Sequence, residues 1–299
     1  MANAPLAPLT TFRVGGPADW LVDVETEAEL AGVLAAAAGA AVPVTLLGGG
    51  SNVLVADAGV RGAVVRARLR GIGAPDATTV RAEAGVTMNG LVRWTIAHGL
   101  AALEAWAGTP GTVGGAIFGN AHFQGRDIGA LVQRARLLAR DGAVATVPRD
   151  EMGFAYDTSR LQATGEILVW AEFAVAPGDP DALRQVARAS LAFRKRTQPL
   201  ALSSAGCIFQ NPDRARDALP ADVPASAGAL VDRAGLKHAR QGDARISGVH
   251  ANFIVNEGGA TAADVRALIE RARDAVEAAF GVRLRDEVRY IGDWPGGGR

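Results

Sequence analysis

The stretch "GTPGTVGGAIFGNA" (residues 108–121) is rich in glycine, and a second glycine-rich stretch, "LLGGGSN" (46–52), precedes it. Glycine has no β-carbon, so its backbone amides can close tightly around anionic oxygens. One such cluster alone is explained more simply as a turn. Two in one chain favour a pair of backbone cradles for a diphosphate group.

Neither stretch fits the common phosphate-binding motifs. The Walker pattern needs Gly-Lys and then Ser or Thr, and this sequence follows neither stretch. Neither stretch has the G-x-G-x-x-G spacing that opens the first helix of a Rossmann fold. If a dinucleotide binds, the fold must therefore be a different one.

The charge balance points to no macromolecular partner. The 299 residues include 31 Lys and Arg against 31 Asp and Glu, without long charged blocks, so no surface for nucleic acid or anionic lipid is expected.

No targeting segment opens the chain and no apolar run approaches the roughly 20 residues that span a bilayer, which favours a cytoplasmic location. Cys207 is the sole cysteine and the four histidines are scattered, so we expect neither an internal disulfide nor a metal site.

The hydrophobic pattern predicts a mixed α and β chain of two or three domains. Thr26 followed by Glu29 is a capping-box pattern at the start of a helix over 26–40. "VPVTLLGGGSN" (42–52) predicts a strand that breaks into the glycines, and a second helix is expected near 88–100.

The C-terminal part begins after a polar break. "APGDPD" (176–181) marks the break, and the segment 181–199 predicts a helix that ends at a proline. "HANFIVNEGG" (250–259) predicts a strand and a turn, and 261–280 carries apolar residues at helical spacing. "VRLRDEVRYIG" (282–292) alternates as a strand.

Six motifs resemble, in order and spacing, those of the UDP-N-acetylenolpyruvoylglucosamine reductase family. They are "TTFRVGGPA" (10–18), "GGGSN" (48–52), "GTPGTVGGAIFGNA", "SSAGCIFQNP" (203–212), "AGLK" (234–237) and "EVRYIGDW" (287–294). The resemblance extends over nearly the whole chain. The short stretch before Cys207 resembles the smaller subtype of the family, which lacks an inserted loop that clamps the substrate.

The resemblance implies an α+β fold, in which a vanillyl-alcohol-oxidase (PCMH) type FAD-binding fold of two subdomains precedes a C-terminal α+β substrate domain. The implied boundaries are 1–70 and 71–180 for the subdomains and 190–293 for the substrate domain, with a frayed tail at 294–299. The implied activity is that of a UDP-N-acetylmuramate dehydrogenase, an oxidoreductase that uses FAD and NADPH. Such an enzyme reduces the enolpyruvyl ether of UDP-N-acetylglucosamine enolpyruvate to UDP-N-acetylmuramate in peptidoglycan synthesis, and so serves cell-wall biogenesis, cell shape and cell division.

Two other function classes stay open on the residues alone. One is an oxidase of the same flavin fold that acts on another substrate, and the other is a nucleotide-binding regulator that has lost catalysis. For all three classes we expect a small-molecule ligand, no nucleic acid, no membrane and a monomer.

The resemblance assigns FAD contacts to both glycine stretches. The residues are Gly48, Gly49, Gly50, Ser51, Asn52, Gly108, Thr109, Pro110, Gly111, Thr112, Gly114, Gly115, Ala116 and Asn120. The two asparagines close their stretches and also suit turns, because asparagine tolerates a left-handed backbone.

Cys207 stands where the family usually has a serine that donates a proton. Reduction leaves negative charge beside the carboxylate of the enolpyruvyl group, and an acid must then protonate the adjacent carbon. A thiol ionises far more readily than an alcohol, so the exchange is chemically reasonable. The alternative is a cysteine that serves as a small buried hydrophobe, but the flanking Gly206 and Asn211 favour the acid.

Glu287 is the second expected catalytic residue. The alternation over 282–292 puts it on the face opposite the apolar side chains, together with arginines. A ladder of cross-strand ion pairs would explain this pattern too. The resemblance instead makes Glu287 a carboxylate that hydrogen-bonds at the reacting centre and helps to stabilise or protonate the intermediate.

The Tyr-Arg-x-Ser motif of the family is matched least well. Tyr156 is present, but Asp157 follows it, and an aspartate there would repel an enolate. Our hypothesis is that Arg160 supplies the missing positive charge, either by swinging in or through a shift in register of the loop. Arg160→Ala is then expected to lower turnover by orders of magnitude, whereas a surface arginine would leave turnover near normal.

Three further residues match positions that suit a substrate with a uridine diphosphate and a carboxylate. Lys195 and Lys237 offer compact positive charges and Asn211 offers amide donors, although each is equally compatible with a surface or turn position. His250 is expected to be a hydrogen-bonded structural histidine.

Overall fold

The computed structural model describes residues 1–217 and 219–294, so the expected tail beyond Trp294 lies outside the described residues. By packing, the chain divides into two compact units. Unit 1 contains Met1, Trp20–Gly49 and Gly62–Arg194, and unit 2 contains Ala2–Asp19, Gly50–Arg61 and Lys195–Arg299. The boundaries expected at 1–70, 71–180 and 190–293 describe functional domains and stay a prediction.

Unit 1 is a mixed α and β unit. Its helices are α1 (Glu27–Gly39), α2 (Met88–Ala97), α3 (Val113–Phe118), α4 (Arg160–Thr164), α5 (Pro180–Thr197, which ends in unit 2) and the short 3-10 helices at Glu104–Trp106, Ile128–Leu131 and Arg149–Met152. Its strands are β2 (Pro17–Val24) and β5 (Val60–Ala67), which both begin in unit 2, and β3 (Val44–Leu46), β6 (Ile72–Asp76), β7 (Thr79–Glu83), β8 (Leu100–Ala101), β9 (His122–Phe123), β10 (Arg126–Asp127), β11 (Val132–Leu138), β12 (Val144–Pro148), β13 (Ile167–Ala174) and β14 (Ala176–Pro177). The predicted helices over 26–40, 88–100 and 181–199 are confirmed.

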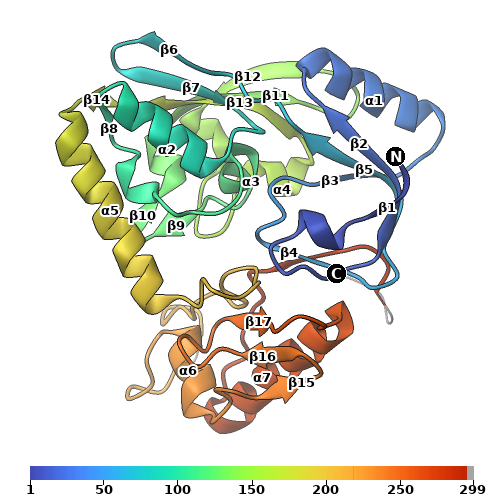
Figure 1. Ribbon diagram of the computed structural model, residues 1–299, viewed down its shortest axis with the longest axis vertical. Coiled ribbons are helices and arrows are strands. Elements are labelled where there is room, and N and C mark those ends of the chain that lie inside the picture. Colours follow the sequence, from blue (N-terminus) through green and yellow to red (C-terminus); the bar gives the residue numbers. More distant parts are fainter. Residues whose placement is uncertain (218, 295–299) are drawn as a thin grey trace. The chain divides into compact units, whose positions relative to one another are not determined.

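The largest sheet of unit 1 is antiparallel, with the strand order β12-β11-β13-β7-β6. Helices α2 and α3 pack against it in Figure 1, and their apolar residues share one core with the inner strands. A second layer places β5 between β2 and β3, where β3 runs parallel to β5. The first glycine-rich stretch follows β3, and the second begins in the loop before α3. Both lie in unit 1, the first of them only as far as Gly49.

The start of α1 follows the predicted capping pattern only in part. The Thr26 hydroxyl accepts a hydrogen bond from the Glu29 N–H at 3.1 Å, as expected. The Glu29 carboxylate accepts from the N–H of Glu25 at 2.7 Å and not from that of Thr26. The cap therefore satisfies two exposed amides, but one of them lies a residue earlier than the pattern predicts.

Unit 2 combines both ends of the chain. Its strands are β1 (Ala2–Pro5), β4 (Val53–Val55), β15 (Arg240–Gln241), β16 (Ala244–Ile246), β17 (Ile254–Asn256) and β18 (Arg289–Ile291), and its helices are α6 (Ala227–Arg233), α7 (Ala262–Phe280) and a 3-10 helix at Ala7–Leu9. Strand β18 pairs in parallel with β4, and α7 packs beside the β15-β16-β17 sheet (Figure 1). A core that includes Phe12, Leu54, Phe209 and Leu268 joins these elements.

The strand predicted over 282–292 is wrong for most of its length, since only Arg289–Ile291 is a strand. The expected alternation of burial does hold, because Val282, Leu284 and Val288 are all buried. Regular pairing fails because the N–H groups of Glu287 and Val288 both approach one carbonyl, that of Ile208. Two residues opposite one partner is the geometry of a bulge, which interrupts a ladder.

Among the described helices, none has the length and apolar character that a membrane span requires.

The strongest helix cap in unit 2 is that of α7. The side chains of Thr261 and Asp264 form a reciprocal capping box, and both carboxylate oxygens of Asp57 accept from the next amides, those of Ala262 and Ala263, at 2.8 and 2.9 Å.

We expect Thr261→Ala to lower the free energy of unfolding by about 1 kcal/mol, because it removes the acceptor of the Asp264 N–H. Urea denaturation followed by circular dichroism measures the change. Arg271→Ala, an exposed position on the same helix, is the control and should leave the free energy of unfolding nearly unchanged. Equal midpoints for the two variants would show that the cap contributes nothing.

Candidate active site

The two glycine-rich stretches meet in unit 1. A β-carbon added to Gly49 would lie 2.6 Å from the Gly111 Cα, and one added to Gly48 would lie 2.9 Å from the Thr112 hydroxyl oxygen. Such distances are shorter than β-carbon contacts in proteins, so only glycine permits this approach. The contact confirms that the two stretches form one backbone structure.

Helix α3 is anchored at its start by the segment before α2. The N–H groups of Val113 and Gly114 donate to the carbonyls of Val86 and Ala84, at 2.8 and 2.9 Å. Gly114 also lies close to Ala84, because a β-carbon there would come within 3.2 Å of the Ala84 carbonyl oxygen. These bonds fix the loop before α3 against the core of the unit.

The middle of the second stretch is held by a buried arginine. The Arg194 guanidinium donates to the Thr109 hydroxyl at 2.8 Å and lies 3.7 Å from the centroid of the Phe123 ring. Asn89 accepts from the N–H of Gly108 at 2.7 Å. The sequence analysis missed Arg194, and the available signal was a basic residue on the apolar face of the helix over 181–199.

Asn120, at the end of the second stretch, is buried and has the left-handed backbone expected of it, with φ 45°. Its side-chain amide donates to the Ala155 carbonyl at 2.8 Å, and its side-chain oxygen accepts from the Gly129 N–H at 2.9 Å. The side chain therefore joins three loops of unit 1. The FAD contact expected of Asn120 stays a prediction.

The first stretch passes from unit 1 into unit 2 between Gly49 and Gly50. Gly50 has φ 63°, and a β-carbon there would lie 2.1 Å from the Leu9 carbonyl oxygen, so glycine is required. The Asn52 side-chain amide donates to the Glu287 carbonyl at 3.2 Å, and the Asn52 carbonyl accepts from the Arg289 N–H at 3.0 Å. Asn52 thus fixes the backbone of a predicted catalytic residue.

Cys207 and Glu287 are brought together in unit 2. The Glu287 N–H donates to the carbonyl of Ile208, the residue after Cys207, at 2.8 Å, and Phe209 pairs with Asp286 in an isolated antiparallel bridge. Both predicted catalytic side chains are half-buried. Residues 80 positions apart in the sequence therefore occupy neighbouring backbone segments, as a shared site requires.

Asn252 holds the Cys207 segment from its other side. Its side-chain oxygen accepts from the Phe209 N–H at 2.9 Å, its side-chain amide donates to the Phe209 carbonyl at 2.8 Å, and its backbone carbonyl accepts from the Ile208 N–H at 2.8 Å. The Asn252 N–H donates to Nδ1 of His250 at 3.2 Å. Burial, with a smaller effect of the Lys237 charge, lowers the pKa of His250. His250 is thus hydrogen-bonded as we expected, and its structural role stays a prediction.

A half-buried ion pair supports the segment that carries Glu287. The Arg273 guanidinium on α7 contacts both carboxylate oxygens of Asp286, at 2.5 and 2.6 Å, and donates to the Leu284 carbonyl at 3.3 Å. Burial raises the pKa of Asp286, although Arg273 opposes this effect, and burial also raises the pKa of Tyr290. The sequence analysis missed this network, since Asp286 and Arg273 lie in charged stretches that read as solvent-exposed.

Tyr156 and Asp157 lie on a loop of unit 1 and Arg160 is the first residue of α4, and the two charged side chains pair with different partners. Arg160 forms a two-point ion pair with Glu166, at 2.9 and 3.2 Å. Asp157 is buried and its Oδ1 lies 3.2 Å from Nδ1 of His122. The basic side chain beside Asp157 is therefore a histidine that the sequence analysis did not single out, and the role of Arg160 stays a prediction.

The predicted substrate residues all lie in unit 2. Lys237 forms an ion pair with Asp232 at 2.7 Å and is partly exposed. The Asn211 side-chain oxygen accepts from the Ala227 N–H at 3.0 Å, at the start of α6. Lys195 is exposed near the end of α5. Their contacts with a substrate stay predictions.

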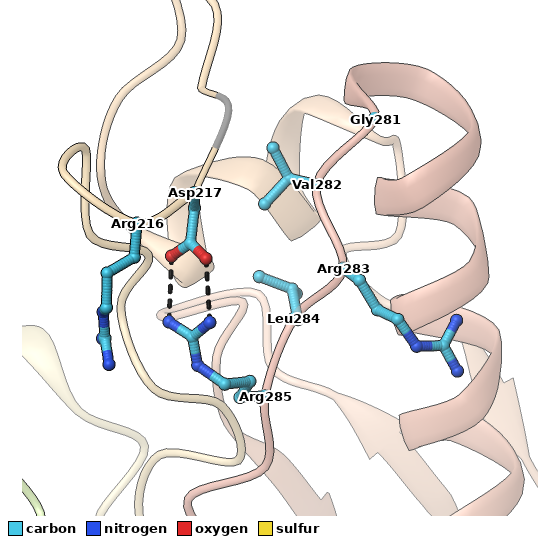
Figure 2. A pocket seen from close by; sticks show the side chains of 7 residues that line it. All are labelled: Arg216, Asp217, Gly281, Val282, Arg283, Leu284 and Arg285. Carbon is cyan, nitrogen blue, oxygen red and sulfur yellow. Dashed lines mark hydrogen bonds and ion pairs between the residues drawn. The ribbon is translucent and has the colours of Figure 1, made fainter.

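A hollow of about 390 Å³ lies elsewhere on unit 2 and is lined by Arg216, Asp217 and residues 281–285. Figure 2 shows that the Arg285 guanidinium meets both carboxylate oxygens of Asp217, at 2.8 and 2.9 Å. The other two arginines that line the hollow also form ion pairs. Arg216 pairs with the carboxylate of Asp213, and Arg283 pairs with that of Glu277. None of the predicted site residues lines this hollow, so it is not the candidate active site.

Comparisons with known proteins match both the N-terminal and the C-terminal parts of the chain. A FAD binding domain model matches residues 18–147, and a model of the C-terminal domain of UDP-N-acetylenolpyruvoylglucosamine reductase matches residues 198–291. UDP-N-acetylenolpyruvoylglucosamine reductase 2 of Symbiobacterium thermophilum is 43% identical over 97% of this chain and 92% of its own length. The chain belongs to the UDP-N-acetylenolpyruvoylglucosamine reductase family.

Two further relatives of the family cover almost the whole chain. The UDP-N-acetylenolpyruvoylglucosamine reductase of Anaeromyxobacter sp. (strain Fw109-5) is 43% identical over 98% of this chain and 89% of its own length. The crystal structure of the enzyme from Thermus caldophilus matches with a TM-score of 0.77 and 34% identity, and covers 96% of this chain and 97% of that chain. The predicted α+β fold class, with a FAD-binding fold and a family C-terminal domain, is confirmed.

The residues of unit 1 fit the FAD of this family. Among the described residues, the N–H groups of Gly48, Gly49 and Thr112 donate to no backbone carbonyl, although their two stretches are in contact. Gly48 and Gly49 are also exposed, so these amides are open to a ligand. Neighbouring glycine-rich loops with amides that donate to no backbone carbonyl suit the anionic oxygens of a diphosphate.

We expect Gly49→Ala to weaken FAD binding by about tenfold or more, because the new β-carbon separates the two stretches and misplaces their amides. Flavin fluorescence titration of the stripped and refolded protein measures the dissociation constant. Gly32→Ala is the control, since a β-carbon in that exposed part of α1 meets nothing within 4 Å. Equal flavin affinity of both variants would contradict the cradle.

Proposed function

We propose that this chain reduces the enolpyruvyl ether of UDP-N-acetylglucosamine enolpyruvate to UDP-N-acetylmuramate, with Cys207 as the proton donor. Membership of the family supports the substrate and the reaction. The observation that carries the assignment of the site is the hydrogen bond from the Glu287 N–H to the Ile208 carbonyl, which holds Glu287 beside the Cys207 segment. The activity serves peptidoglycan synthesis.

The cofactors supply the hydride, and the residues of the protein hold the cofactor. FAD, when bound and reduced by NADPH, supplies the hydride that the double bond accepts. We propose that the amides of Gly48, Gly49 and Thr112 help to hold its diphosphate, and that the other predicted residues of both stretches shape the remainder of the site. The sequence carries no separate motif for a nicotinamide, which supports successive binding of NADPH and substrate at one place.

Cys207 holds the proton that the substrate carbon needs. After hydride addition the negative charge is shared by that carbon and the adjacent carboxylate, and the S–H proton moves to the carbon while the electron pair stays on sulfur. Gly206, with φ 82°, gives the segment before the thiol a turn that other residues adopt with strain. The three hydrogen bonds between Asn252 and residues 208 and 209 fix the backbone that follows the thiol.

Glu287 contributes a carboxyl group to the same centre. Its backbone is fixed by Ile208 and Asn52, and its neighbour Asp286 is fixed by Arg273. A side chain with so well anchored a backbone can keep one orientation while charge develops on the substrate. We propose that Glu287 stabilises or protonates the intermediate by hydrogen bonding.

The substrate is a small anionic UDP-sugar, for which we propose contacts from Lys195, Asn211 and Lys237. We propose Tyr156 as a further catalytic residue. Lys195 and Lys237 offer positive charge to a diphosphate or carboxylate. Tyr156 is 40% exposed and so can reach a ligand. A monomer in the cytoplasm remains our proposal for the state and location of the protein.

Cys207→Ala should slow the reduction of the sugar nucleotide about a hundred- to ten-thousand-fold, because it removes a positioned proton donor. Cys207→Ser keeps a hydroxyl donor and should retain much more of the rate. Stopped-flow absorbance of the flavin separates its reduction by NADPH, expected to be unchanged, from its reoxidation by the enolpyruvyl sugar nucleotide.

The wild-type protein is the reference for this experiment. Consumption of NADPH that depends on the enolpyruvyl sugar nucleotide supports the proposed function, and reoxidation in air alone would point to an oxidase instead. A Cys207→Ala enzyme that reoxidises at the wild-type rate would remove Cys207 from the mechanism without removing the function.

A further inference from the structure

The segment that follows Cys207 has a backbone neighbour on one side in unit 2. Residues 208–210 run antiparallel to residues 285–287, and Phe209 lies opposite Asp286. The hydrogen bonds between the two segments, at 2.8 and 2.9 Å, are made by the residues on either side of Phe209. In an antiparallel pair, a residue in this position directs its own N–H and C=O to the opposite side.

Asn252 binds both backbone groups of Phe209 on that opposite side. Its side-chain oxygen accepts from the Phe209 N–H at 2.9 Å, and its side-chain amide donates to the Phe209 carbonyl at 2.8 Å. One side chain thus takes the place of the peptide groups of a further strand. Phe209 is 2% exposed and Asn252 is 3% exposed, so removal of these bonds would leave two buried backbone groups unsatisfied.

The backbone of Asn252 holds the residue next to Cys207. The Asn252 carbonyl accepts from the Ile208 N–H at 2.8 Å, and the Ile208 carbonyl accepts from the Glu287 N–H at 2.8 Å. Ile208 is therefore held by Asn252 through its N–H and by the Glu287 segment through its carbonyl. A shift of Asn252 would move the backbone of Cys207 relative to that of Glu287.

Asn252 itself is well anchored in unit 2. It lies two residues before β17, whose three residues are all buried. The Asn252 N–H donates to Nδ1 of His250 at 3.2 Å, and the Phe253 N–H donates to the His250 carbonyl at 3.0 Å, which closes a turn. The side chain of Asn252 therefore extends from a fixed backbone to the Cys207 segment.

We propose that Asn252 is a positioning residue of the reaction, which sets the place of the Cys207 thiol relative to the Glu287 carboxyl group. The inference rests on the proposed function, which gives these two side chains their roles. Asn252 acts through the backbone of residues 208 and 209. Misplacement of a reacting group by about 1 Å can cost about a hundredfold in rate, so these bonds affect turnover as well as stability.

The first test measures the position of the thiol without turnover. Cys207 is the sole cysteine of the chain, so alkylation of the flavin-loaded protein by iodoacetamide, followed by mass spectrometry of the cysteine peptide, reports on this side chain alone. Asn252→Leu keeps a branched side chain and removes both side-chain hydrogen bonds. We expect alkylation to become about tenfold faster, because the segment opens more often. An unchanged rate would overturn the proposal.

Asn256→Leu is the matched control. Asn256 is also buried, and its side chain also makes several hydrogen bonds. The partners of that side chain are the Phe12 carbonyl and the N–H groups of Gly258 and Ala260. Both variants should lose stability in urea denaturation, but Asn256→Leu should keep the wild-type alkylation rate of Cys207. Equal acceleration in both variants would indicate a general loosening of unit 2 and would count against a positioning role.

Asn252→Asp provides a test if Asn252→Leu does not fold. A protonated carboxylic acid has a donor and an acceptor, as the amide does, whereas a carboxylate has acceptors alone and would face the Phe209 carbonyl. The alkylation rate of this variant, divided by that of the wild type at the same pH, should therefore be near one in acidic buffer and higher in basic buffer. A ratio that stays high in acidic buffer would contradict the role of the two side-chain bonds.

A kinetic cycle tests whether Asn252 acts through Cys207. Asn252→Leu should slow the reoxidation of the flavin by the enolpyruvyl sugar nucleotide about ten- to a hundredfold and leave the reduction of the flavin by NADPH unchanged. In the Cys207→Ala protein the same substitution should have a much smaller effect, because no thiol is left to position. An undiminished effect in that protein would refute action through Cys207.

The proposed function and this inference fail in different ways. A wild-type protein without turnover on the enolpyruvyl sugar nucleotide would refute the function, and the alkylation of Cys207 would still report on Asn252. A wild-type protein with turnover, whose Asn252→Leu variant keeps the wild-type alkylation rate and the wild-type rate of flavin reoxidation, would refute the inference alone.

Discussion

The approach of two glycine-rich loops is the constraint on which unit 1 depends. Gly49 lies so close to Gly111 that any side chain at position 49 would force the loops apart. The loops bring exposed backbone amides together without a charged side chain among them, which explains why neither a Walker lysine nor a Rossmann glycine pattern is needed. In unit 2 a single backbone contact has a similar effect. The Ile208 carbonyl accepts the N–H of Glu287 and so holds the Glu287 backbone beside the Cys207 segment.

Much of the fold could be predicted from local pattern. The helices over 26–40, 88–100, 181–199 and 261–280 have clear caps or apolar spacing, and the structure confirms them. The predicted strand over 282–292 was mostly wrong because alternation reports only which face is buried. Whether a ladder forms depends on the partner segment, here residues 208–210, which the sequence places far away.

Motifs singled out Cys207, Glu287 and the glycines as candidate site residues, and their roles stay predictions. Residues that act through tertiary contacts gave no such signal. Arg194 and Arg273 lie on helices whose charged residues are mostly exposed, yet each is buried or half-buried against a ring and a polar partner. His122 was passed over because four scattered histidines predict no metal cluster, and its contact with Asp157 depends on how two loops meet. Asp157 shows why an isolated departure from a family motif is difficult to interpret, since its basic partner, His122, stands 35 positions earlier in the chain.

The parallel pairing of β4 with β18 has a consequence for synthesis of the protein. Residues 53–55 take as their neighbours residues 289–291, so this small sheet joins segments that are widely separated in the sequence. Contacts of such sequence separation form late, because the intervening chain must be ordered first. Unit 2 therefore cannot complete its fold until residues 289–291 have been synthesised. Until then the apolar residues of its earlier segments, Phe12 and Leu54 among them, lack some of their final partners.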